Sequence, residues 1–199
     1  MTQNDFVTCA GMILTGGRSR RMGRDKAAIA WPGPDSPTLA VRTAALLNAV
    51  CPTAVEVGPG HTQLARIPES VPGGGPLAAL VAGWHGLVAS GWTGPVLVVA
   101  TDLPLLSEGL LRWLADFPDQ RSVVPLAGGR VQPLCARYSP ADLDVAASLL
   151  ARGRRAMLSL VEDLDAAHPD EAAWAGPAGH SAALDDVDTP GDLTRLAGR

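Results

Sequence analysis

Short apolar runs alternate along the chain with longer segments of helical periodicity. Residues 7–14, 54–57 and 95–100 each predict a buried strand, and the last of these, PVLVVA, is continuous enough for a central strand covered on both faces. Further strands are expected at residues 122–125 and 131–137, around the turn Gly128-Gly129, and at residues 183–187.

Helices are expected between these strands. Thr38 and Ser107 are placed to cap helices that run to about residues 50 and 115. Other helices are predicted at residues 77–89, 139–151, 154–162 and 191–196. Residues 61–72 are expected to be irregular, and the polar, proline-bearing stretch 163–179 is the only segment expected to be mobile. This order predicts an α/β fold, a three-layer α/β/α sandwich around a mainly parallel, mixed sheet of Rossmann-like type.

Ligands of such sheets bind beyond the carboxyl ends of the strands, where three candidate segments fall: the loop after Leu14, Thr101-Asp102 and Val187-Asp188. The first reads LTGGRSRRMGRDK and ends on Lys26, the only lysine of a chain whose other basic side chains are arginines. Gly16 and Gly17 allow the backbone to approach an anion, and the basic side chains supply charge. The segment therefore predicts a phosphate-binding loop, although it matches neither the Walker nor the dinucleotide pattern.

The composition and charge of the chain narrow its domain organisation and the kinds of function that it can have. The chain has 199 residues, 47% of them hydrophobic, which predicts one domain, and its net charge of −4 argues against non-specific nucleic-acid binding. The cysteines Cys9, Cys51 and Cys135 are far apart and form no metal-binding pattern, so they are expected to be buried. We find no leader-like N-terminus and no apolar run of membrane-spanning length, which favours a cytoplasmic protein without membrane contact.

Five segments resemble those of the MobA-like nucleotidyltransferases, and among them the molybdenum cofactor guanylyltransferases. The segment GMILTGGRSRRMGRDK, residues 11–26, is similar to the opening signature of that family. The other four are GPLA at 75–78, TDLP at 101–104, GRVQPL at 129–134 with Tyr138, and VDTP at 187–190 with Asp192-Leu193. Together they extend over most of the chain.

The resemblance implies a nucleotide-diphosphosugar transferase fold and a Mg²⁺-dependent transfer of GMP from GTP to Mo-molybdopterin. Transient contacts with cofactor-delivery proteins or apo-molybdoenzymes would follow from such a role. It implies that Lys26, Arg21 and Asp102 are catalytic and that Asp102 holds the metal. Asp188, from its place after the expected strand 183–187, is the second candidate for the metal. The implied nucleotide-binding residues are Leu14, Thr15, Gly16, Gly17, Lys26, Glu69, Gly75, Pro76, Leu77 and Asp102.

Alternatives remain at several of these positions. From its place alone, Asp102 suits either a Mg²⁺ ligand or a cap of the turn before Ser107. Asp188 stands where the family usually has Asn, which keeps a cytidylyltransferase or another nucleotidyltransferase open, and it also suits a helix cap. Glu69 is either the acid near the nucleoside or a solvated loop residue. The arginines around Gly153 are either helix-end charges or a second anion site, for the acceptor's phosphate. A non-catalytic carrier that binds GTP or the pterin is the alternative of another class.

Overall fold

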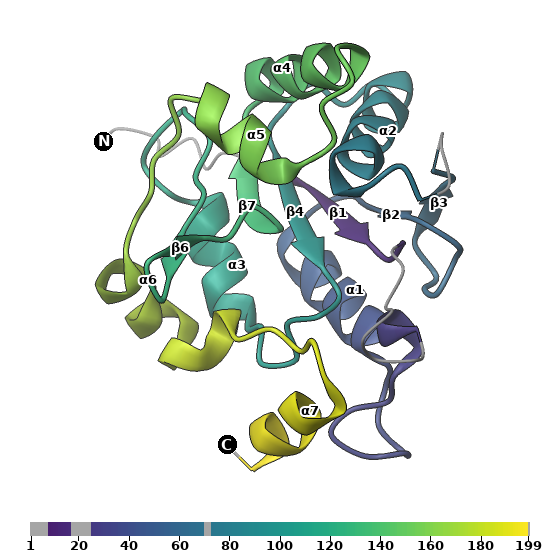
Figure 1. Ribbon diagram of the computed structural model, residues 1–199, viewed down its shortest axis with the longest axis vertical. Coiled ribbons are helices and arrows are strands. Elements are labelled where there is room, and N and C mark those ends of the chain that lie inside the picture. Colours follow the sequence, from purple (N-terminus) through teal and green to yellow (C-terminus); the bar gives the residue numbers. More distant parts are fainter. Residues whose placement is uncertain (1–7, 17–24, 70–72, 199) are drawn as a thin grey trace.

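A five-stranded sheet forms the centre of the computed structural model, which describes residues 8–16, 25–69 and 73–198. The strand order is β3-β2-β1-β4-β7, and only β7 is antiparallel to its neighbour (Figure 1). The strands are β1 (Ala10–Leu14), β2 (Ala54–Val57), β3 (Ala65–Ile67), β4 (Val96–Ala100) and β7 (Cys135–Tyr138). A separate hairpin joins β5 (Leu126–Ala127) to β6 (Arg130–Val131). The mixed, mainly parallel sheet confirms the predicted fold class.

Helices cover both faces of this sheet. One hydrophobic cluster packs α2 (Pro76–Ala89), α4 (Pro140–Ala151) and α5 (Met157–Asp163) against it, and a second packs α1 (Leu39–Val50), α3 (Glu108–Ala115) and α6 (Glu171–Ala178). The helix α7 (Pro190–Ala197) lies apart from these layers, near one end of the molecule (Figure 1). Two 3₁₀ turns complete the fold, η1 (Lys26–Ala28) and η2 (Ser181–Leu184).

Alternation along the strands explains the two clusters. In β1 the buried side chains of Met12 and Leu14 belong to the first cluster, whereas Ile13 belongs to the second. Because successive side chains of a strand point to opposite faces, a strand covered on both faces must be apolar throughout. The continuous apolar runs of β1 and β4 are therefore accounted for by the helical layers on both sides.

The predicted helix starts are confirmed by their caps. The side chains of Thr38, Ser107 and Ser139 each accept a hydrogen bond from a backbone N–H in the first turn of α1, α3 and α4, respectively.

A glycine allows α2 to lie close to the sheet, since a Cβ on Gly83 would come within 2.5 Å of Met12 Cε and 2.8 Å of Val57 Cγ2. The three cysteines are buried and form no disulfide, as expected from their spacing.

Five expectations need correction. Residues 183–187 are no strand, because η2 buries Ala182, Ala183 and Leu184 in a helical turn. Residues 122–125 form only isolated bridges at Val123, while the predicted strand 131–137 divides into β6 and β7. The stretch 61–72 contributes the short strand β3. The segment 163–179 contains α6, which is anchored by the fully buried Trp174.

Candidate active site

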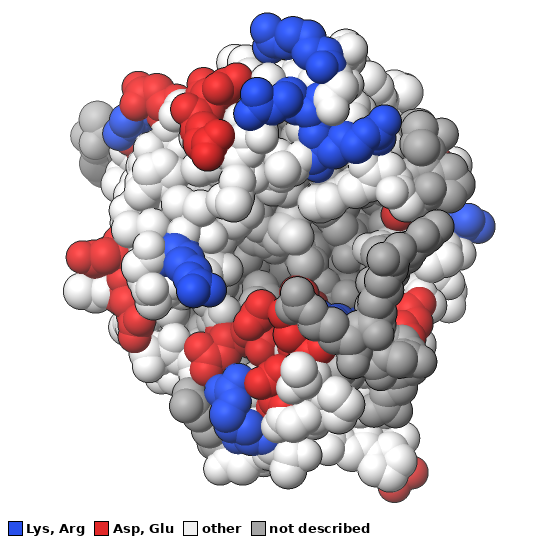
Figure 2. Space-filling model, viewed as in Figure 1, with Lys and Arg blue, Asp and Glu red and all other residues white. Residues whose placement is uncertain are grey.

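A cavity of about 460 Å³ opens at the carboxyl ends of β1 and β4, beside the start of α2. This volume lies within the range of small-molecule sites. Figure 2 shows the hollow in the middle of this face, with acidic side chains along its lower rim and basic side chains above it. The lining residues are Leu14, Thr15, Gly16, Asp25, Lys26, Ala27, Glu69, Gly73, Gly75, Pro76, Ala79, Ala100, Thr101, Asp102 and Leu134.

The end of β1 forms one wall of this cavity. The Thr15 N–H donates to the Val57 carbonyl at 3.0 Å, which continues the β1–β2 ladder by one residue. Gly16 follows, and a Cβ there would lie 1.7 Å from Glu69 Oε1. The Glu69 carboxylate thus lies directly against the backbone of Gly16, and its other oxygen accepts from the Gly73 N–H at 3.0 Å. Glu69 is therefore a residue of the cavity wall and not a solvated loop glutamate.

The start of α2 forms the opposite wall. Gly75 has φ +93°, a conformation that L side chains rarely adopt, and Pro76 then begins the helix without any side-chain cap. The uncapped N-terminus of a fourteen-residue helix attracts negative charge. Arg155 lies beside this loop, where its Nη1 donates to the Gly74 carbonyl at 3.3 Å. One arginine of the predicted second anion site therefore adjoins the cavity.

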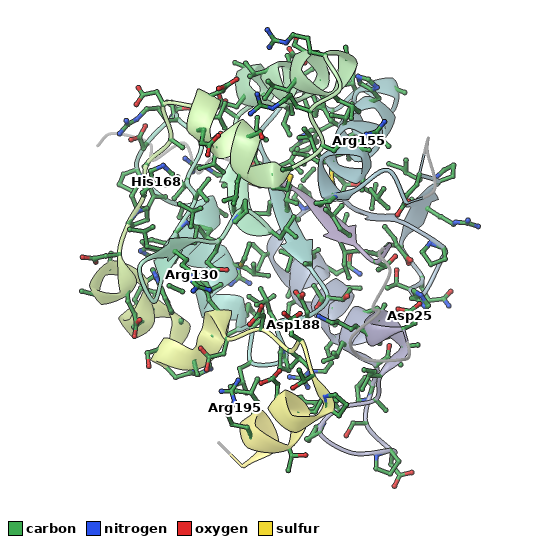
Figure 3. All side chains as sticks on the ribbon, viewed as in Figure 1. Asp25, Arg130, Arg155, His168, Asp188 and Arg195 are labelled. Atoms are coloured by element: carbon green, nitrogen blue, oxygen red, sulfur yellow. The ribbon has the colours of Figure 1, made fainter. Side chains whose placement is uncertain are left out.

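Lys26 joins two carboxylates at the mouth of the cavity. Its Nζ lies 2.7 Å from Asp188 Oδ1 and 3.6 Å from Asp102 Oδ2, and its side chain is only 15% exposed. Asp102 follows the end of β4, while Asp188 arrives from the segment before α7, where the Val187 N–H donates to the Asp102 carbonyl at 2.9 Å. In Figure 3, Asp188 lies in the middle of this face, between Arg130 and Asp25. Two of the three predicted strand-end segments thus meet directly, and Lys26, after the first, joins them.

The same cluster determines the protonation of Asp102. Burial raises the pKa of its carboxyl group, Lys26 lowers it, and Asp186 and Asp188 raise it again. The net result is a pKa above the ordinary value for aspartate. The carboxylate therefore gains from any additional cation that approaches it.

We tested whether these residues suit Mg²⁺. Asp102 and Asp188 both offer carboxylate oxygens to one cationic group, which is the donor chemistry that Mg²⁺ prefers. Among the residues whose structure is described, no three acidic, histidine or cysteine side chains group to hold a metal. The pair therefore fits an ion that completes its shell with phosphate oxygens and water, and it does not form a cage made by protein alone.

Most of the predicted site residues gather in this cavity. Leu14, Thr15, Gly16, Lys26, Glu69, Gly75, Pro76 and Asp102 all line it. Leu77 does not line the cavity and needs correction, because α2 turns its side chain into the core, where it is fully buried. Asp188 is not part of the lining either and is connected to it through Lys26. Asp188 caps no helix, since Thr189 caps α7. The predictions for Gly17 and Arg21 fall outside the described residues.

Sequence reasoning missed several residues of the cavity wall. Asp25 stands directly before Lys26 and caps η1 through its carboxylate, which accepts from the Ala27 N–H at 3.0 Å. Its position in the basic segment was a usable signal. Leu134 follows Gln132-Pro133 in a motif that had been noted, whereas Ala79 and Ala100 carry no chemical signal that could have identified them.

These features together define an α/β protein with a cavity of small-molecule size, lined by charged side chains, at the carboxyl edge of its sheet. The chain belongs to the MobA-like NTP transferase family, whose model matches residues 11–170, and it is a nucleotidyltransferase. A probable molybdenum cofactor guanylyltransferase from Chloroflexus aggregans is 30% identical to it over 92% of this chain and 91% of its own length. Another from Mycobacterium tuberculosis is 36% identical over 81% of this chain and 83% of its own.

Solved structures agree with this fold. Molybdopterin-guanine dinucleotide biosynthesis protein A from Archaeoglobus fulgidus superposes with a TM-score of 0.75 at 21% identity, over 95% of this chain and 97% of its own. A 2-C-methyl-D-erythritol 4-phosphate cytidylyltransferase from Thermus thermophilus superposes with a TM-score of 0.62 at 18% identity, over 96% of this chain and 98% of its own. Within the part of the chain that the structure describes, no helix has the length and apolar character needed to cross a bilayer.

Proposed function

We propose that this protein transfers GMP from GTP to the terminal phosphate of Mo-molybdopterin, giving the guanine dinucleotide form of the cofactor and pyrophosphate. The observation that carries the proposal is that Lys26 and Asp102 line one cavity together with Thr15-Gly16 and the start of α2, and that Asp188 forms an ion pair with Lys26. The family and the names of its relatives agree with such a transfer.

The reaction requires an oxygen of the acceptor's phosphate to attack the α-phosphorus of GTP. The bond from the α-phosphorus to the bridging oxygen of the β-phosphate breaks, and pyrophosphate leaves with that electron pair. A phosphate monoester is largely ionised near neutral pH, so no strong general base is needed. Catalysis then consists of positioning the reactants and stabilising negative charge.

Each described residue of the cavity has a part in this scheme. The Lys26 ammonium neutralises charge on the phosphates, and the backbone of Thr15 and Gly16 encloses the base together with Gly75 and Pro76. Glu69 accepts hydrogen bonds from the nucleoside. Arg155, beside the same loop, attracts the phosphate of the acceptor. These roles are supported by the position of the groups in the cavity lining or beside it and by their charge.

Asp102, with Asp188 beside it, would hold Mg²⁺. When bound, this ion supplies positive charge to phosphate oxygens and orients them for displacement. The two aspartates then have a second task, because they keep the Lys26 ammonium at the same end of the cavity. We expect metal and lysine to face the phosphates from neighbouring positions.

The decisive experiment offers GTP, CTP and ATP separately to the protein with Mg²⁺ and Mo-molybdopterin. Formation of the dinucleotide is followed by mass spectrometry and release of pyrophosphate by a coupled assay. We expect product from GTP alone, and none from the Lys26→Met variant. Product from CTP would assign the protein to cytidylyl transfer, and binding of GTP without pyrophosphate release would indicate a carrier.

A further inference from the structure

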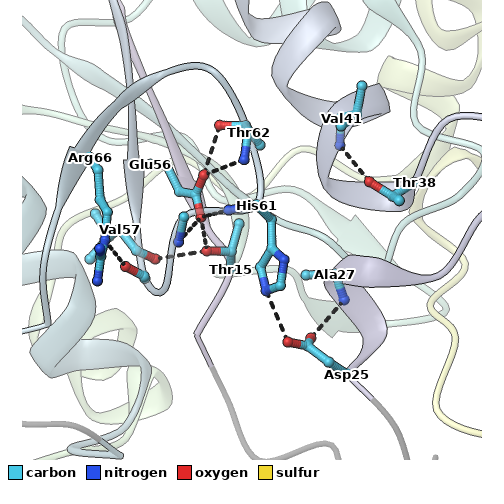
Figure 4. Close-up of polar contacts among 12 residues, drawn as sticks. Thr15, Asp25, Ala27, Thr38, Val41, Glu56, Val57, His61, Thr62 and Arg66 are labelled. Atoms are coloured by element: carbon cyan, nitrogen blue, oxygen red, sulfur yellow. Dashed lines mark hydrogen bonds and ion pairs between the residues drawn. The ribbon is translucent and has the colours of Figure 1, made fainter.

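A buried carboxylate in β2 organises the surroundings of the nucleotide cavity. Glu56 has no exposed surface, although its neighbours in the strand, Val55 and Val57, are apolar. Its Oε1 accepts hydrogen bonds from the Thr15 hydroxyl at 2.6 Å and from the N–H groups of Gly60 and His61 at 2.9 and 2.7 Å. Its Oε2 accepts from the N–H and hydroxyl of Thr62 at 2.8 and 2.7 Å (Figure 4).

These contacts make Glu56 a fixed, charged anchor. Burial alone would raise the pKa of the carboxyl group, but the hydrogen bonds from Thr15, His61 and Thr62 outweigh it and lower the pKa below the ordinary value for glutamate. A buried charge that lost these donors would be strongly unfavourable. The segment 60–62 and Thr15 are therefore held in one arrangement around the carboxylate.

The first consequence concerns the end of β1. Gly58 lies so close to the cavity wall that a Cβ on it would meet Thr15 Oγ1 at 2.2 Å and Gly16 N at 2.9 Å. Its φ of +149° is also a conformation that favours glycine. The loop after β2 thus supports Thr15 and Gly16 directly, both through packing and through the hydroxyl bond to Glu56.

The second consequence concerns Lys26. The ring of His61 points from the same loop to Asp25, and its Nε2 lies 2.9 Å from Asp25 Oδ2 (Figure 4). An ionised carboxylate only accepts hydrogen bonds, so Nε2 is the nitrogen that donates. The other oxygen of Asp25 accepts from the Ala27 N–H and caps η1, which begins at Lys26. Glu56, His61 and Asp25 thus form a continuous connection from Thr15 to the residue before Lys26.

We propose that Glu56 and His61 are positioning residues, which fix Thr15-Gly16 and Lys26 relative to each other. In this arrangement one nucleotide can place its base against Thr15-Gly16 and its phosphates against Lys26. The kinetic part of this inference rests on the proposed function. The side chains of His61 and Asp25 are 22% and 45% exposed, and ion pairs at such positions add little to stability. Their bond therefore has its main effect on the position of η1.

The chain offers a direct probe of this positioning. Because Lys26 is the only lysine in the sequence, isotope-labelled lysine gives side-chain NMR signals from this residue alone. We expect His61→Ala to shift or broaden the Lys26 signals. In His61→Gln, which keeps a hydrogen-bond donor, the change in these signals should be smaller than in His61→Ala. The midpoint of urea unfolding should stay close to the wild-type value in both variants.

His168→Ala is the matched control. The His168 ring also makes one hydrogen bond, from Nδ1 to the Val124 carbonyl at 3.0 Å, but His168 does not line the cavity and lies far from Asp25 in Figure 3. This variant should leave both the Lys26 signals and turnover unchanged. In His61→Ala, turnover of GTP should fall about tenfold or more, since small misplacements of a charged group reduce rates this strongly.

Glu56→Gln extends the test to the other end of the connection. We expect it to change the Lys26 signals and also to weaken binding of Mg·GTP, because an amide keeps only one of the two acceptor oxygens and leaves part of the donors around Glu56 unpaired. If this variant fails to fold, Thr15→Val removes the same hydroxyl bond and leaves the carboxylate in place. Unchanged lysine signals and unchanged turnover in His61→Ala would overturn the proposal. Altered signals in a protein whose wild type neither binds nor uses GTP would refute the proposed function alone.

Discussion

At the scale of single residues, Lys26 owes its position to parts of the chain that are far apart. Its ammonium contacts Asp188, which lies 162 positions away in the sequence, and also faces Asp102 at the end of β4. Such an arrangement fixes a flexible side chain before any ligand arrives, so less ordering remains to be done in the transition state. Arginine would deliver its charge as a planar fork and would not fit the same contacts.

Replacing Lys26 by methionine should remove this charge and leave the fold intact. We expect turnover to fall about 100-fold or more, as when a preorganised charge-stabilising group is deleted. Circular dichroism and the urea midpoint should remain near those of the wild type, because the side chain lies at the cavity mouth. A Lys26→Met protein with near-normal turnover would show that the ammonium has no catalytic part.

The two aspartates should differ in their effect on the metal requirement. Asp188 Oδ1 is engaged by Lys26 at 2.7 Å, whereas the nearest Asp102 oxygen is 3.6 Å away and more readily given to a metal ion. Asp102→Asn should therefore raise the Mg²⁺ concentration for half-maximal turnover about tenfold or more, and Asp188→Asn much less. Titrations of turnover against Mg²⁺ measure this, and an equal rise in both variants would make Asp188 a metal ligand of the same rank.

Asp102→Asn should also change stability with pH. Since the folded protein raises the pKa of this carboxyl group, the folded state binds its proton more tightly than the unfolded state does. Ionised Asp102 therefore destabilises the fold as pH rises above the unfolded pKa. With Mg²⁺ chelated, we expect Asp102→Asn to exceed the wild type in free energy of unfolding at neutral pH, and the two to converge at acidic pH. A lower stability of the variant at neutral pH would support a structural role for Asp102.

At the scale of elements, α6 shows that a helix from a polar stretch of sequence can be anchored in the core by one buried side chain. Trp174 is fully buried, and its indole Nε1–H donates to the Leu126 carbonyl at 2.8 Å, which joins α6 to β5. Trp174→Ala should lower the free energy of unfolding by about 3–5 kcal/mol. Trp174→Phe keeps most of the apolar contact and should lose about 1–3 kcal/mol, mainly by leaving the carbonyl without its donor. Urea unfolding of the two variants tests this ranking.

The elements that the sequence predicted correctly share strong local signals. The strands β1 and β4 are apolar runs, and β2 is apolar except for Glu56. The helices α1 and α3 follow Thr38 and Ser107, whose side chains each accept a hydrogen bond from the N–H group three positions later. By contrast, α6 carries Gly176 and Pro177 within a polar stretch, and the burial of Trp174 anchors it to the core. The apolar segment 182–184 fits a strand or a helical turn equally well, and its neighbours in the core decide between them.

The residues of the candidate site also fall into those that the sequence identified and those that it could not. Glycines and charges near the strand ends identified Gly16, Lys26 and Asp102, because parallel strands bring their carboxyl ends to one edge, whereas Gly75 was identified by the family resemblance. The contact of Glu69 with Gly16 and the connection from His61 to Asp25 were beyond reach, since they depend on how the segments after β3 and β2 fold back. Leu77 was misplaced because a motif gives no information on the rotation of the helix that contains it.

At the scale of the whole molecule, a nucleotide in this cavity would join segments that the chain supplies separately. The end of β1, the start of α2 and the end of β4 each contribute to the wall, and Lys26 links them to the segment before α7 through Asp188. A ligand that contacts all of them binds only the folded state. Its binding free energy therefore adds to the stability of the whole fold.

This linkage can identify the nucleotide without any acceptor. At a ligand concentration 100 times the dissociation constant, stabilisation amounts to about 2.7 kcal/mol. For a chain of this size that raises the melting temperature by roughly 5–10 °C. We expect Mg·GTP to produce this shift, Mg·CTP and Mg·ATP to produce much less, and Lys26→Met to reduce the response to GTP. A larger shift with CTP would instead show that the cavity selects cytosine. The presence of Asp188, where the family usually has Asn, would then be associated with that preference.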